Sequence, residues 1–418
     1  MEMMDSSRQI LKKGYVCDNC LGRQFAQLLS GCTNKERGRA IRLVLAMEAE
    51  NKDNCIDPSN FVGINFRNKK IEPKKTACYV CDGLFDSLPK ITLKILKEIK
   101  DLEYETFHIG VRLSEKLLNN EEALWDASGI ESTESIKKEL ARETGKLVSK
   151  KTKKEVDLKN PDIVVLLNLD RNAIEVAINS FFIYGRYKKY AKIPQTKHYC
   201  PDCHGSGCDR CAWRGLTYTT SVQQLAGEPL LCATEGIDTK FHGQGREDVD
   251  VLCLGWRPFV IEVLEPRKRN LDLKKLQKDI NASSKNQIEV DGLRCSDKSE
   301  VQNIKSTHPD KTYLLRLKTA KPIKKTDLKK LDQLVGTIIQ KTPDRVKHRR
   351  ADIERKRAVY SVRYSLEKDG HLKVELKTQA GLYIKELATG DSNRTNPSIA
   401  KLLETDIEVV DLTVLNVE

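Results

Sequence analysis

Eight of the 13 cysteines in this 418-residue chain form four Cys-x-x-Cys pairs. Each such turn aims two sulfurs at one point, so two pairs supply the four thiolates of a tetrahedral zinc site. Four protein ligands leave no open position for water, and such a zinc ion would be structural. The first predicted site is Cys17, Cys20, Cys78 and Cys81, and a second possible site is Cys200, Cys203, Cys208 and Cys211.

Each cysteine set has an alternative interpretation. The long segment between the first two pairs leaves open four buried or reactive thiols that share no site. The second set is tighter, and Gly205 and Gly207 let the chain fold back between its pairs. It could also be a cysteine-bearing loop that holds no ion. A redox pair is disfavoured for the first set because neither of its pairs opens a thioredoxin-like βαβ unit.

A carboxylate is presented by the segment FHGQGREDVDVLCLGWRPFVIEV, residues 241–263. Gly243 and Gly245 shortly precede Asp248, which predicts a tight loop just before sheet structure. Taken alone, Asp248 is more often a turn or cap residue than a catalytic one. A dinucleotide site is disfavoured because no strand and helix flank a complete G-x-G-x-x-G unit.

Two later segments carry further candidates. The segment KTYLLRLKT predicts a strand that bears Tyr313, and QAGLYIKELATGD places Tyr383, Ile384 and Lys385 together after a strand. Each has an ordinary explanation, because an aromatic residue on a sheet is usually core and an isolated lysine is usually surface.

The charge balance favours a polyanionic partner. The chain has 73 Lys and Arg against 60 Asp and Glu, a formal net charge of +13. Such an excess suggests nucleic acid, although it can also reflect only a solvated surface. One basic stretch is Lys341 to Arg357, with eight basic and three acidic residues. Its arginines Arg345, Arg349 and Arg350 are candidate phosphate contacts, and the alternative is a solvated loop.

These residues must be positioned by more than one domain. Helical segments and the strand FHIGVRL, the helix ESIKKELARETGKLVSK and the strand DIVVLLNL predict an α+β domain over residues 1–190. A cysteine-rich linker follows over 191–215. Residues 216–418 are rich in strands, interrupted by the helical stretches LDLKKLQKDI and TDLKKLDQLVG. This pattern predicts a large, mainly antiparallel sheet flanked by helices.

Composition excludes several classes of protein. With 39% hydrophobic and 32% charged residues, the chain is too apolar for a disordered protein. Apolar stretches such as Ile163 to Leu167 are far too short to span a membrane. The first residues show no secretory signal, so we expect a cytoplasmic protein with metal-bound rather than disulfide-bonded cysteines. We also expect a monomer.

In combination, the carboxylate loop, the strand tyrosine and the G-x-Y-I-K motif resemble the three signature motifs of pseudouridine synthases. The chain most resembles the archaeal-type tRNA pseudouridine synthase that acts on uridines 54 and 55 of the TΨC arm. The matching motifs span almost the whole chain. They are CDNCLGRQFAQLL, PDIVVLLNLDRNAIEVAINSFFIYGRYKKY, FHGQGREDVDV, RPFVIEV, TPDRVKHRRAD, GLYIKELATGD and NRTNPSIA.

The resemblance implies a zinc-bearing, THUMP-like RNA-binding domain followed by a pseudouridine synthase domain. The enzyme would flip a uridine into a pocket and isomerise it without an organic cofactor. Asp248 would then be the carboxylate that assists cleavage of the glycosidic bond, and Lys385 would keep it ionised and oriented. Tyr313 would stack on the flipped uracil and could assist removal of the proton at C5. Tyr383 would be a second substrate contact, and Ile384 would wall the pocket.

The basic stretch that carries Arg345, Arg349 and Arg350 resembles the thumb loop with which that family grips the tRNA arm. Two other functions remain open. One is a non-catalytic zinc-containing tRNA-binding protein. The other is a different THUMP-type enzyme, such as an RNA methyltransferase or thiouridine synthase. It is disfavoured because the chain shows neither a glycine-rich nucleoside loop after an acidic strand end nor a Ser-Gly-Gly pyrophosphate loop.

Overall fold

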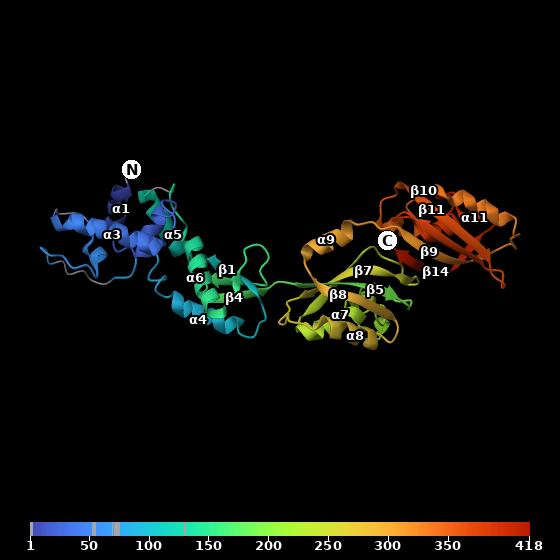
Figure 1. Ribbon diagram of the computed structural model, residues 1–418, viewed down its shortest axis with the longest axis horizontal. Helices are drawn as coiled ribbons and strands as arrows, with labels where there is room; N and C mark the ends of the chain where they lie inside the picture. The colour runs from blue at the N-terminus through green and yellow to red at the C-terminus, as the bar shows by residue number, and fades with distance from the viewer. Residues whose placement is uncertain (1–2, 52–55, 69, 71–75, 129–130) are drawn as a thin grey trace. The chain divides into compact units, whose positions relative to one another are not determined.

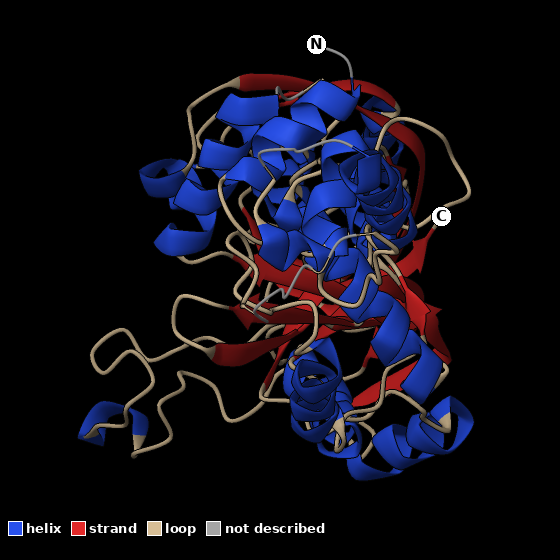
Figure 2. Ribbon diagram, turned by 90° about the vertical axis from the view of Figure 1, so that its left-hand side faces the viewer, coloured by secondary structure: helices blue, strands red, loops and turns tan. Residues whose placement is uncertain are grey.

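The computed structural model describes residues 3–51, 56–68, 70, 76–128 and 131–418, with the side chains of 51, 127, 128 and 349 excluded (Figure 1). The chain forms two compact units, Met1–Asn179 and Ser180–Glu418. Both helices and strands build the protein (Figure 2), in agreement with the expected α+β class. Among the described residues, no helix combines the length and the apolar character that crossing a membrane requires.

The first unit combines helices with a four-stranded sheet. Its helices are α1 (Met3–Lys12), α2 (Asp18–Gly22), α3 (Asn34–Asn51), α4 (Leu88–Ile99), α5 (Glu115–Ser128) and α6 (Ile136–Thr152), with the short 3₁₀ helices η1 (Arg23–Phe25) and η2 (Pro58–Phe61). Its strands are β1 (Thr106–Arg112), β2 (Glu155–Val156), β3 (Ile163–Asn168) and β4 (Ala173–Ile178), in the order β2-β1-β3-β4.

Alternation of side chains along β1 explains how this sheet packs. Phe107, Ile109 and Val111 point to one face and are buried, as a strand with one covered face requires. Helix α6 begins at the N-cap Ser135, whose hydroxyl accepts the amide of Lys138, and it packs on β1. Strand β1 pairs in parallel with β2 and β3, whereas β3 pairs antiparallel with β4.

The second unit contains a ten-stranded sheet of order β13-β10-β11-β12-β9-β14-β7-β5-β8, with β6 also paired to β7. Strand β14 runs parallel to β7, and the other pairings among the described strands are antiparallel. Both sheets of the protein are therefore mixed. The strands are β5 (Phe181–Lys189), β6 (Asp238–Gly243), β7 (Leu252–Leu264), β8 (Ile288–Ser296), β9 (Lys311–Thr319), β10 (Gly336–Lys341), β11 (Glu354–Leu366), β12 (Leu372–Thr378), β13 (Thr395–Asn396) and β14 (Ile407–Val417).

Helices cover parts of this sheet. In Figure 1, α7 and α8 lie together against the region of β5, β7 and β8, and they bury one of the two large cores of the unit. The helices are α7 (Val222–Thr234), α8 (Leu273–Ser283), α9 (Lys298–Ser306), α10 (Ile384–Thr389) and α11 (Ile399–Leu403), with 3₁₀ helices η3 (Asp209–Cys211), η4 (Asp327–Leu334) and η5 (Asp344–Arg349).

Two elements differ from the sequence-based expectation. Strand β5 pairs with β7 and β8 in the second unit, so the first compact unit ends at Asn179 rather than at residue 190. A strand pattern does not say which sheet receives the strand. The stretch TDLKKLDQLVG, expected to be helical, forms the 3₁₀ helix η4 rather than an α-helix, and it buries Leu328, Leu331 and Leu334. Their spacing of three residues matches the three residues per turn of a 3₁₀ helix.

Helices α2 and α3 approach so closely that both need glycine. A Cβ atom on Gly22 would lie 1.8 Å from the carbonyl oxygen of Asn34, and one on Gly38 would lie 1.9 Å from that of Asp18. Both neighbours are backbone atoms, so they can move only if the helices separate. Close contact of α2 with α3 also fixes Cys17 and Cys20, which flank the start of α2.

We expect Gly38→Ala to lower the free energy of unfolding of the first unit by about 3 kcal/mol, because overpacking must separate two helices. Gly145→Ala is the matched control. Its Cβ would lie 3.6 Å from Val156 in ordinary contact, and alanine in helix α6 should stabilise the unit by about 0.5–1 kcal/mol. Hydrogen exchange in peptides from α2 and α3 measures both effects. Equal protection in Gly38→Ala and the wild type would contradict the packing argument.

Candidate active site and cysteine clusters

A cavity of about 850 Å³ lies in the second unit, at the loop between β6 and β7 that carries Asp248. Segments far apart in the sequence meet at its wall. The loop contributes Asp248, strand β9 contributes Tyr313, and the start of α10 contributes Tyr383, Ile384 and Lys385. The structure therefore brings together all five residues that the sequence predicted for catalysis and substrate binding in this unit.

Lys385 contacts two carboxylates at once. Its Nζ lies 3.4 Å from Oδ2 of Asp248, and it donates to both carboxylate oxygens of Asp250 at 2.9 and 2.8 Å. Burial raises the pKa of Asp250, but the hydrogen bond and charge of Lys385 outweigh burial and lower that pKa overall. Asp250 is the closer partner of the lysine, although sequence analysis considered only Asp248.

Arg345 is the second cation beside Asp248. Its Nη1 lies 3.4 Å from Oδ2 of Asp248, while its Nε donates to Oε1 of Glu386 at 2.7 Å. Glu386 is 5% exposed and follows Lys385 in helix α10. Its buried carboxylate therefore fixes the guanidinium of Arg345. The Asp248 carboxylate is thus placed between an ammonium and a guanidinium, with 42% of its side chain exposed to the cavity.

A buried polar network holds the backbone on both sides of Asp248. The Glu247 carboxylate accepts the hydroxyl of Tyr187 at 2.9 Å and lies 3.3 Å from Nε of Arg257. Nζ of Lys189 lies 3.7 Å from Glu247 and donates to the carbonyl of Asp248 at 3.3 Å. Burial raises the pKa of Tyr187 and lowers that of Lys189. With Glu247 turned inward, Asp248 is left facing the cavity.

The two tyrosines of the site have different surroundings. Burial raises the pKa of Tyr313 to about 12, so its phenol remains protonated near neutral pH. The hydroxyl of Tyr383 accepts a hydrogen bond from Nη1 of Arg350 at 2.8 Å. Its backbone amide donates to Oε1 of Gln340 at 2.8 Å, and its carbonyl accepts Nε2 of the same side chain. Gln340 thereby fixes the start of α10.

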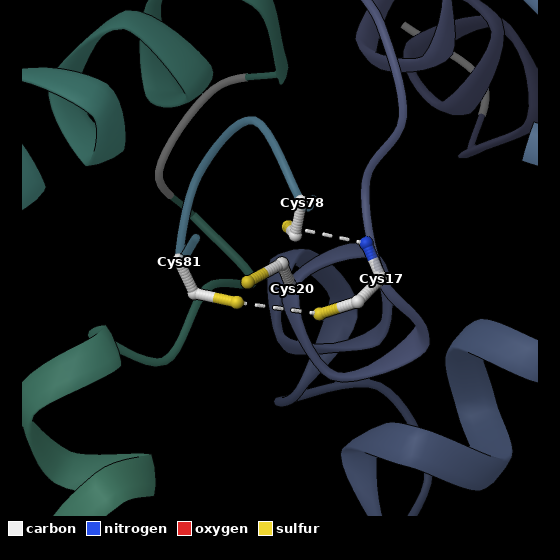
Figure 3. A group of neighbouring side chains, drawn as sticks. All are labelled: Cys17, Cys20, Cys78 and Cys81. Atoms are coloured by element: carbon white, nitrogen blue, oxygen red, sulfur yellow. Dashed lines mark hydrogen bonds between the residues drawn. The ribbon is translucent and has the colours of Figure 1, made fainter. Parts of the chain in front are cut away.

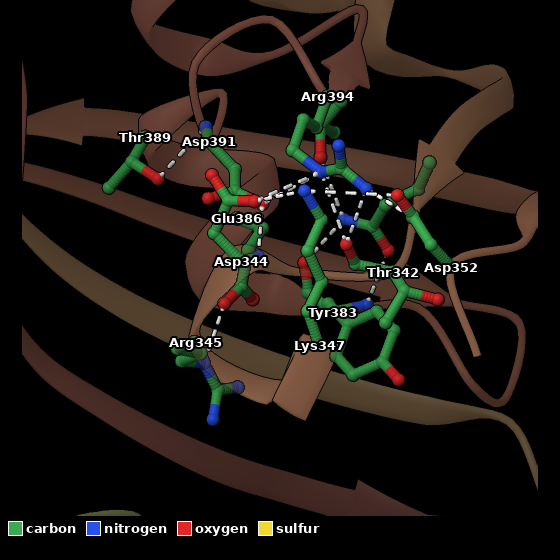
Figure 4. Close-up of polar contacts among 12 residues, drawn as sticks. Thr342, Asp344, Arg345, Lys347, Asp352, Tyr383, Glu386, Thr389, Asp391 and Arg394 are labelled. Carbon is green, nitrogen blue, oxygen red and sulfur yellow. Dashed lines mark hydrogen bonds and ion pairs between the residues drawn. The ribbon is translucent and has the colours of Figure 1, made fainter. Parts of the chain in front are cut away.

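The basic stretch 341–357 is tied to its surroundings by several of its charges (Figure 4). Arg394 donates to the carbonyl of Thr342 at 2.9 and 3.1 Å and also pairs with Asp352. Lys347 forms an ion pair with Asp344 at 2.7 Å. These contacts hold η5, and with it Arg345, against the loop that follows α10. The side chain of Arg349 lies outside the described residues.

Four cysteines of the first unit converge on one point (Figure 3). The Sγ atoms of Cys17, Cys20, Cys78 and Cys81 all lie within 4.8 Å of one another, and those of Cys17 and Cys81 are 3.6 Å apart. Four sulfurs held tetrahedrally at 2.3 Å from zinc are separated by about 3.8 Å. The backbone amide of Cys17 also donates to Sγ of Cys78 at 3.2 Å. This cluster can hold a metal ion.

Fully buried Arg23 supports an anionic centre there. Its side chain is 0% exposed, and among the described residues its guanidinium nitrogens have no hydrogen-bond partner. Burial raises the pKa of the Cys20 thiol, and the charge of Arg23 acts in the opposite direction. A zinc ion with four thiolates carries a net negative charge, which offsets the cost of burying a guanidinium. The ion pair with Glu121, at 3.5 Å, supplies part of the same compensation.

The four cysteines of the second cluster also bring their sulfur atoms together. Sγ of Cys200 lies 3.7 Å from that of Cys208, and Sγ of Cys203 lies 3.8 Å from that of Cys211. Backbone amides donate to the sulfurs, as they do in structural metal sites. Those of Gly207 and Gly215 lie 3.2 Å from Cys203 and Cys211 respectively. The two cysteine clusters can therefore each bind a metal ion.

Two protein families match parts of this chain. The family described as "Pus10, C-terminal" matches residues 182–418, and "Pus10 THUMP domain, archaeal" matches residues 91–168. A tRNA pseudouridine synthase Pus10 from Methanothrix thermoacetophila is 39% identical over 427 residues, covering 100% of this chain and 94% of the relative. One from Methanopyrus kandleri is 39% identical over 428 residues, covering 99% and 98%.

The chain belongs to the Pus10 family. It is therefore a tRNA pseudouridine synthase of the archaeal type with a THUMP domain, as its motifs indicated. This Pus10 chain carries Asp248 in the matched C-terminal region, together with the cavity and the second cysteine cluster. The first cysteine cluster lies N-terminal to the matched THUMP segment.

Several residues of the Pus10 site were not found from sequence. Asp250 was visible as a second carboxylate in the same motif, but no pattern said that it contacts Lys385. Glu386 reads as an ordinary helix residue, and its burial follows only from the packing of α10. Lys189 lies 59 residues before Asp248 in the chain. Its role depends on β5 joining the larger sheet.

We expect Tyr187→Phe to lower the free energy of unfolding of the second unit by about 1–3 kcal/mol, because buried Glu247 and Gln195 both lose a hydrogen-bond partner. Tyr218→Phe removes a hydroxyl from a partly exposed residue of the same unit and should change stability by less than about 0.5 kcal/mol. Urea unfolding of both variants measures the difference. Equal stability of the two variants would show that the network does not hold the loop.

Proposed function

We propose that this Pus10 chain isomerises uridines 54 and 55 in the TΨC arm of tRNA, with Asp248 as the reacting carboxylate. The observation that carries the proposal is the position of Asp248 between Lys385 and Arg345 at the open cavity. Its motifs also resemble the enzymes that modify those two uridines. Isomerisation is redox-neutral and moves no group from a donor, so it requires no organic cofactor.

The geometry supports a defined sequence of steps. The target nucleotide leaves its stack, which costs roughly a few kcal/mol, and enters the cavity. The half-buried Tyr313 ring stacks on the uracil, and Tyr383 and Ile384 complete the wall. The ionised carboxylate of Asp248 then assists cleavage of the bond between N1 and C1′. The freed base turns, and C5 bonds to C1′.

Lys385 and Arg345 are the two cations beside the Asp248 carboxylate. Nη1 of Arg345 and Nζ of Lys385 each lie 3.4 Å from Oδ2 of Asp248, so both place positive charge beside the carboxylate that the proposed reaction uses. Neither cation donates a short hydrogen bond to Asp248, because Lys385 is drawn toward Asp250 and Arg345 toward Glu386. The carboxylate is therefore oriented but still accessible to the ribose. Lys385 cannot make the bidentate contact of an arginine, which leaves more of the carboxylate free.

Binding of the tRNA arm is assigned to the surface around the cavity. Arg350 and Arg349 in the basic stretch are proposed phosphate contacts, and the THUMP-containing unit provides a second RNA-binding region. Arg345 was grouped with them on sequence, but its inward partners Asp248 and Glu386 favour a role beside the reacting carboxylate. We propose a monomer. The reaction is placed in the cytoplasm.

Both cysteine clusters are proposed to hold structural zinc. Cys17, Cys20, Cys78 and Cys81 would hold one ion, and Cys200, Cys203, Cys208 and Cys211 the other. Zinc would supply folding free energy there and no chemical step, since four thiolates complete its coordination. The alternative of a non-catalytic tRNA-binding protein is disfavoured because the residues around Asp248 are all assembled.

The direct test of this proposal is Asp248→Asn, which removes the charge and keeps the shape. We expect pseudouridine formation to fall by more than about a hundredfold, while tRNA affinity stays within about twofold of the wild type, a change below about 0.5 kcal/mol. Asp411→Asn removes a carboxylate that pairs with Lys192 outside the cavity and should retain full activity. Residual activity of Asp248→Asn within tenfold of the wild type would overturn the assignment.

Arg345→Ala and Arg350→Ala should separate turnover from binding. Arg345→Ala should lower kcat with little change in KM, because it removes a partner of Asp248. Arg350→Ala should weaken tRNA binding and flatten its salt dependence by up to about one unit of log-log slope. Arg363→Ala, an 83%-exposed residue of β11, is the control. An unchanged salt slope in Arg350→Ala would leave that residue as surface only.

Metal analysis of the purified protein should give about two zinc ions per chain. Cys81→Ser and Cys208→Ser should each reduce the content to about one, with loss of stability confined to the unit that carries the substitution. Cys232 is exposed and outside both clusters, so Cys232→Ser should leave both ions bound. A protein that resists thermal unfolding equally with and without chelator, and holds no zinc, would contradict the assignment.

A further inference from the structure

Lys311 lines the same cavity as Asp248 but has no part in the steps above. It lies two residues before Tyr313 on β9, so the two side chains share one face of the strand. Its Nζ donates to the carbonyl of Pro309 at 3.3 Å. The same atom lies 3.8 Å from the point where a Cβ on Gly245 would be. Lys311 therefore reaches the cavity beside the loop that bears Asp248.

The reaction needs a proton acceptor at C5, and the steps proposed above assign none. Once C5 is bonded to C1′, its hydrogen must leave as a proton to restore the ring. Tyr313 is an unfavourable acceptor because burial raises its pKa to about 12, which keeps the phenol protonated and its oxygen weakly basic. His198 lines the cavity too, but its Nε2 contacts Nη2 of Arg246 at 2.8 Å.

We propose that the neutral amine of Lys311 accepts the C5 proton in the final step of the isomerisation. The inference rests on the proposed function of the Asp248 site. The C5–H bond breaks and its electron pair forms the C5–C6 double bond. The electron pair of the N1–C6 double bond moves onto N1, which takes a proton from water. The proton on Nζ of Lys311 then passes to solvent, so charge and atoms balance.

The surroundings of Lys311 support a neutral amine. Burial, and next the charge of Arg257 on β7, lower the pKa of Lys311 to about 8. Cys253 of β7, Asp310 of β9 and Glu247 of the catalytic loop act in the opposite direction. Among the described residues, no carboxylate forms an ion pair with the ammonium. Roughly a tenth of Lys311 is therefore uncharged at pH 7, and most of it by pH 9.

A tRNA substrate that contains 5-fluorouridine separates proton removal at C5 from cleavage of the bond between N1 and C1′. A fluorine at C5 leaves no proton to remove, so tRNA that contains 5-fluorouridine should be rearranged by Lys311→Ala at the wild-type rate. On ordinary tRNA, the same variant should be slower by about a hundredfold or more. Asp248→Asn should be slow on both substrates. If Asp248→Asn were active on both, the proposed function would fail, and not this inference alone.

Isotope effects and amine rescue test the proton transfer itself. In Lys311→Ala, deuterium at C5 should slow the reaction more than twofold, and added methylamine or ethylamine should restore activity in proportion to the free amine. The wild-type rate should rise with pH up to about 8, and the variant should lose that rise. Lys318→Ala, a 67%-exposed lysine of the same strand, should behave as the wild type throughout.

Lys311→Met keeps the side-chain length and should show the same loss on ordinary tRNA with unchanged thermal stability. A Lys311→Ala rate within threefold of the wild type on ordinary tRNA would overturn the inference. So would equal defects on ordinary and 5-fluorouridine tRNA, which would indicate a positioning role. Loss of the pH-dependent rise in His308→Ala rather than in Lys311→Ala would assign the step to His308.

Discussion

The charge of Asp248 is the constraint on which the rest of the site depends. In the proposed mechanism, the carboxylate has to face the cavity and remain accessible to the flipped nucleotide. Two cations lie 3.4 Å from Oδ2 of Asp248 without covering the carboxylate, because each is drawn to a second carboxylate. The buried contacts of Glu247 and Lys189 fix the backbone on both sides of Asp248, which leaves its side chain facing the cavity.

Magnitudes indicate what these ion pairs do. Asp248 is 42% exposed and Asp250 61% exposed, and exposed pairs of this kind contribute only about 0–1 kcal/mol to stability. Holding the fold is therefore not their main effect. The buried set around Glu247 is different, since removing one partner there leaves a charged or polar group desolvated at a cost of about 1–3 kcal/mol. The buried contacts of Glu247 therefore contribute to stability, whereas the exposed ion pairs of Asp248 and Asp250 serve the proposed reaction.

Sequence alone predicted the residues with a motif around them. Asp248, Tyr313 and Lys385 each lie in a recognisable segment, and the family resemblance placed them in one site. The two cysteine clusters could also be predicted, because the Cys-x-x-Cys spacing reflects the geometry of metal ligands. Most strands of the larger sheet were visible from alternation, including β9 and β12.

Contacts that only the folded chain creates were not predictable. Charge counting treated Arg345 as a phosphate contact, since nothing in the sequence brings η5 to Glu386. Strand β5 was assigned to the first domain because its pattern is the same in either sheet. The 3₁₀ geometry of η4 depends on three leucines that meet the core at a spacing of three residues. In each case, packing between distant segments decided the outcome.

The most direct measurement is the position of the product. An unmodified tRNA transcript is incubated with the purified protein alone, without ATP or S-adenosylmethionine, and pseudouridine is mapped by carbodiimide treatment and primer extension. We expect new stops at uridines 54 and 55 and nowhere else in the transcript. Stops at other uridines would contradict the proposed substrate position, and a transcript without stops would contradict a catalytic Asp248 site.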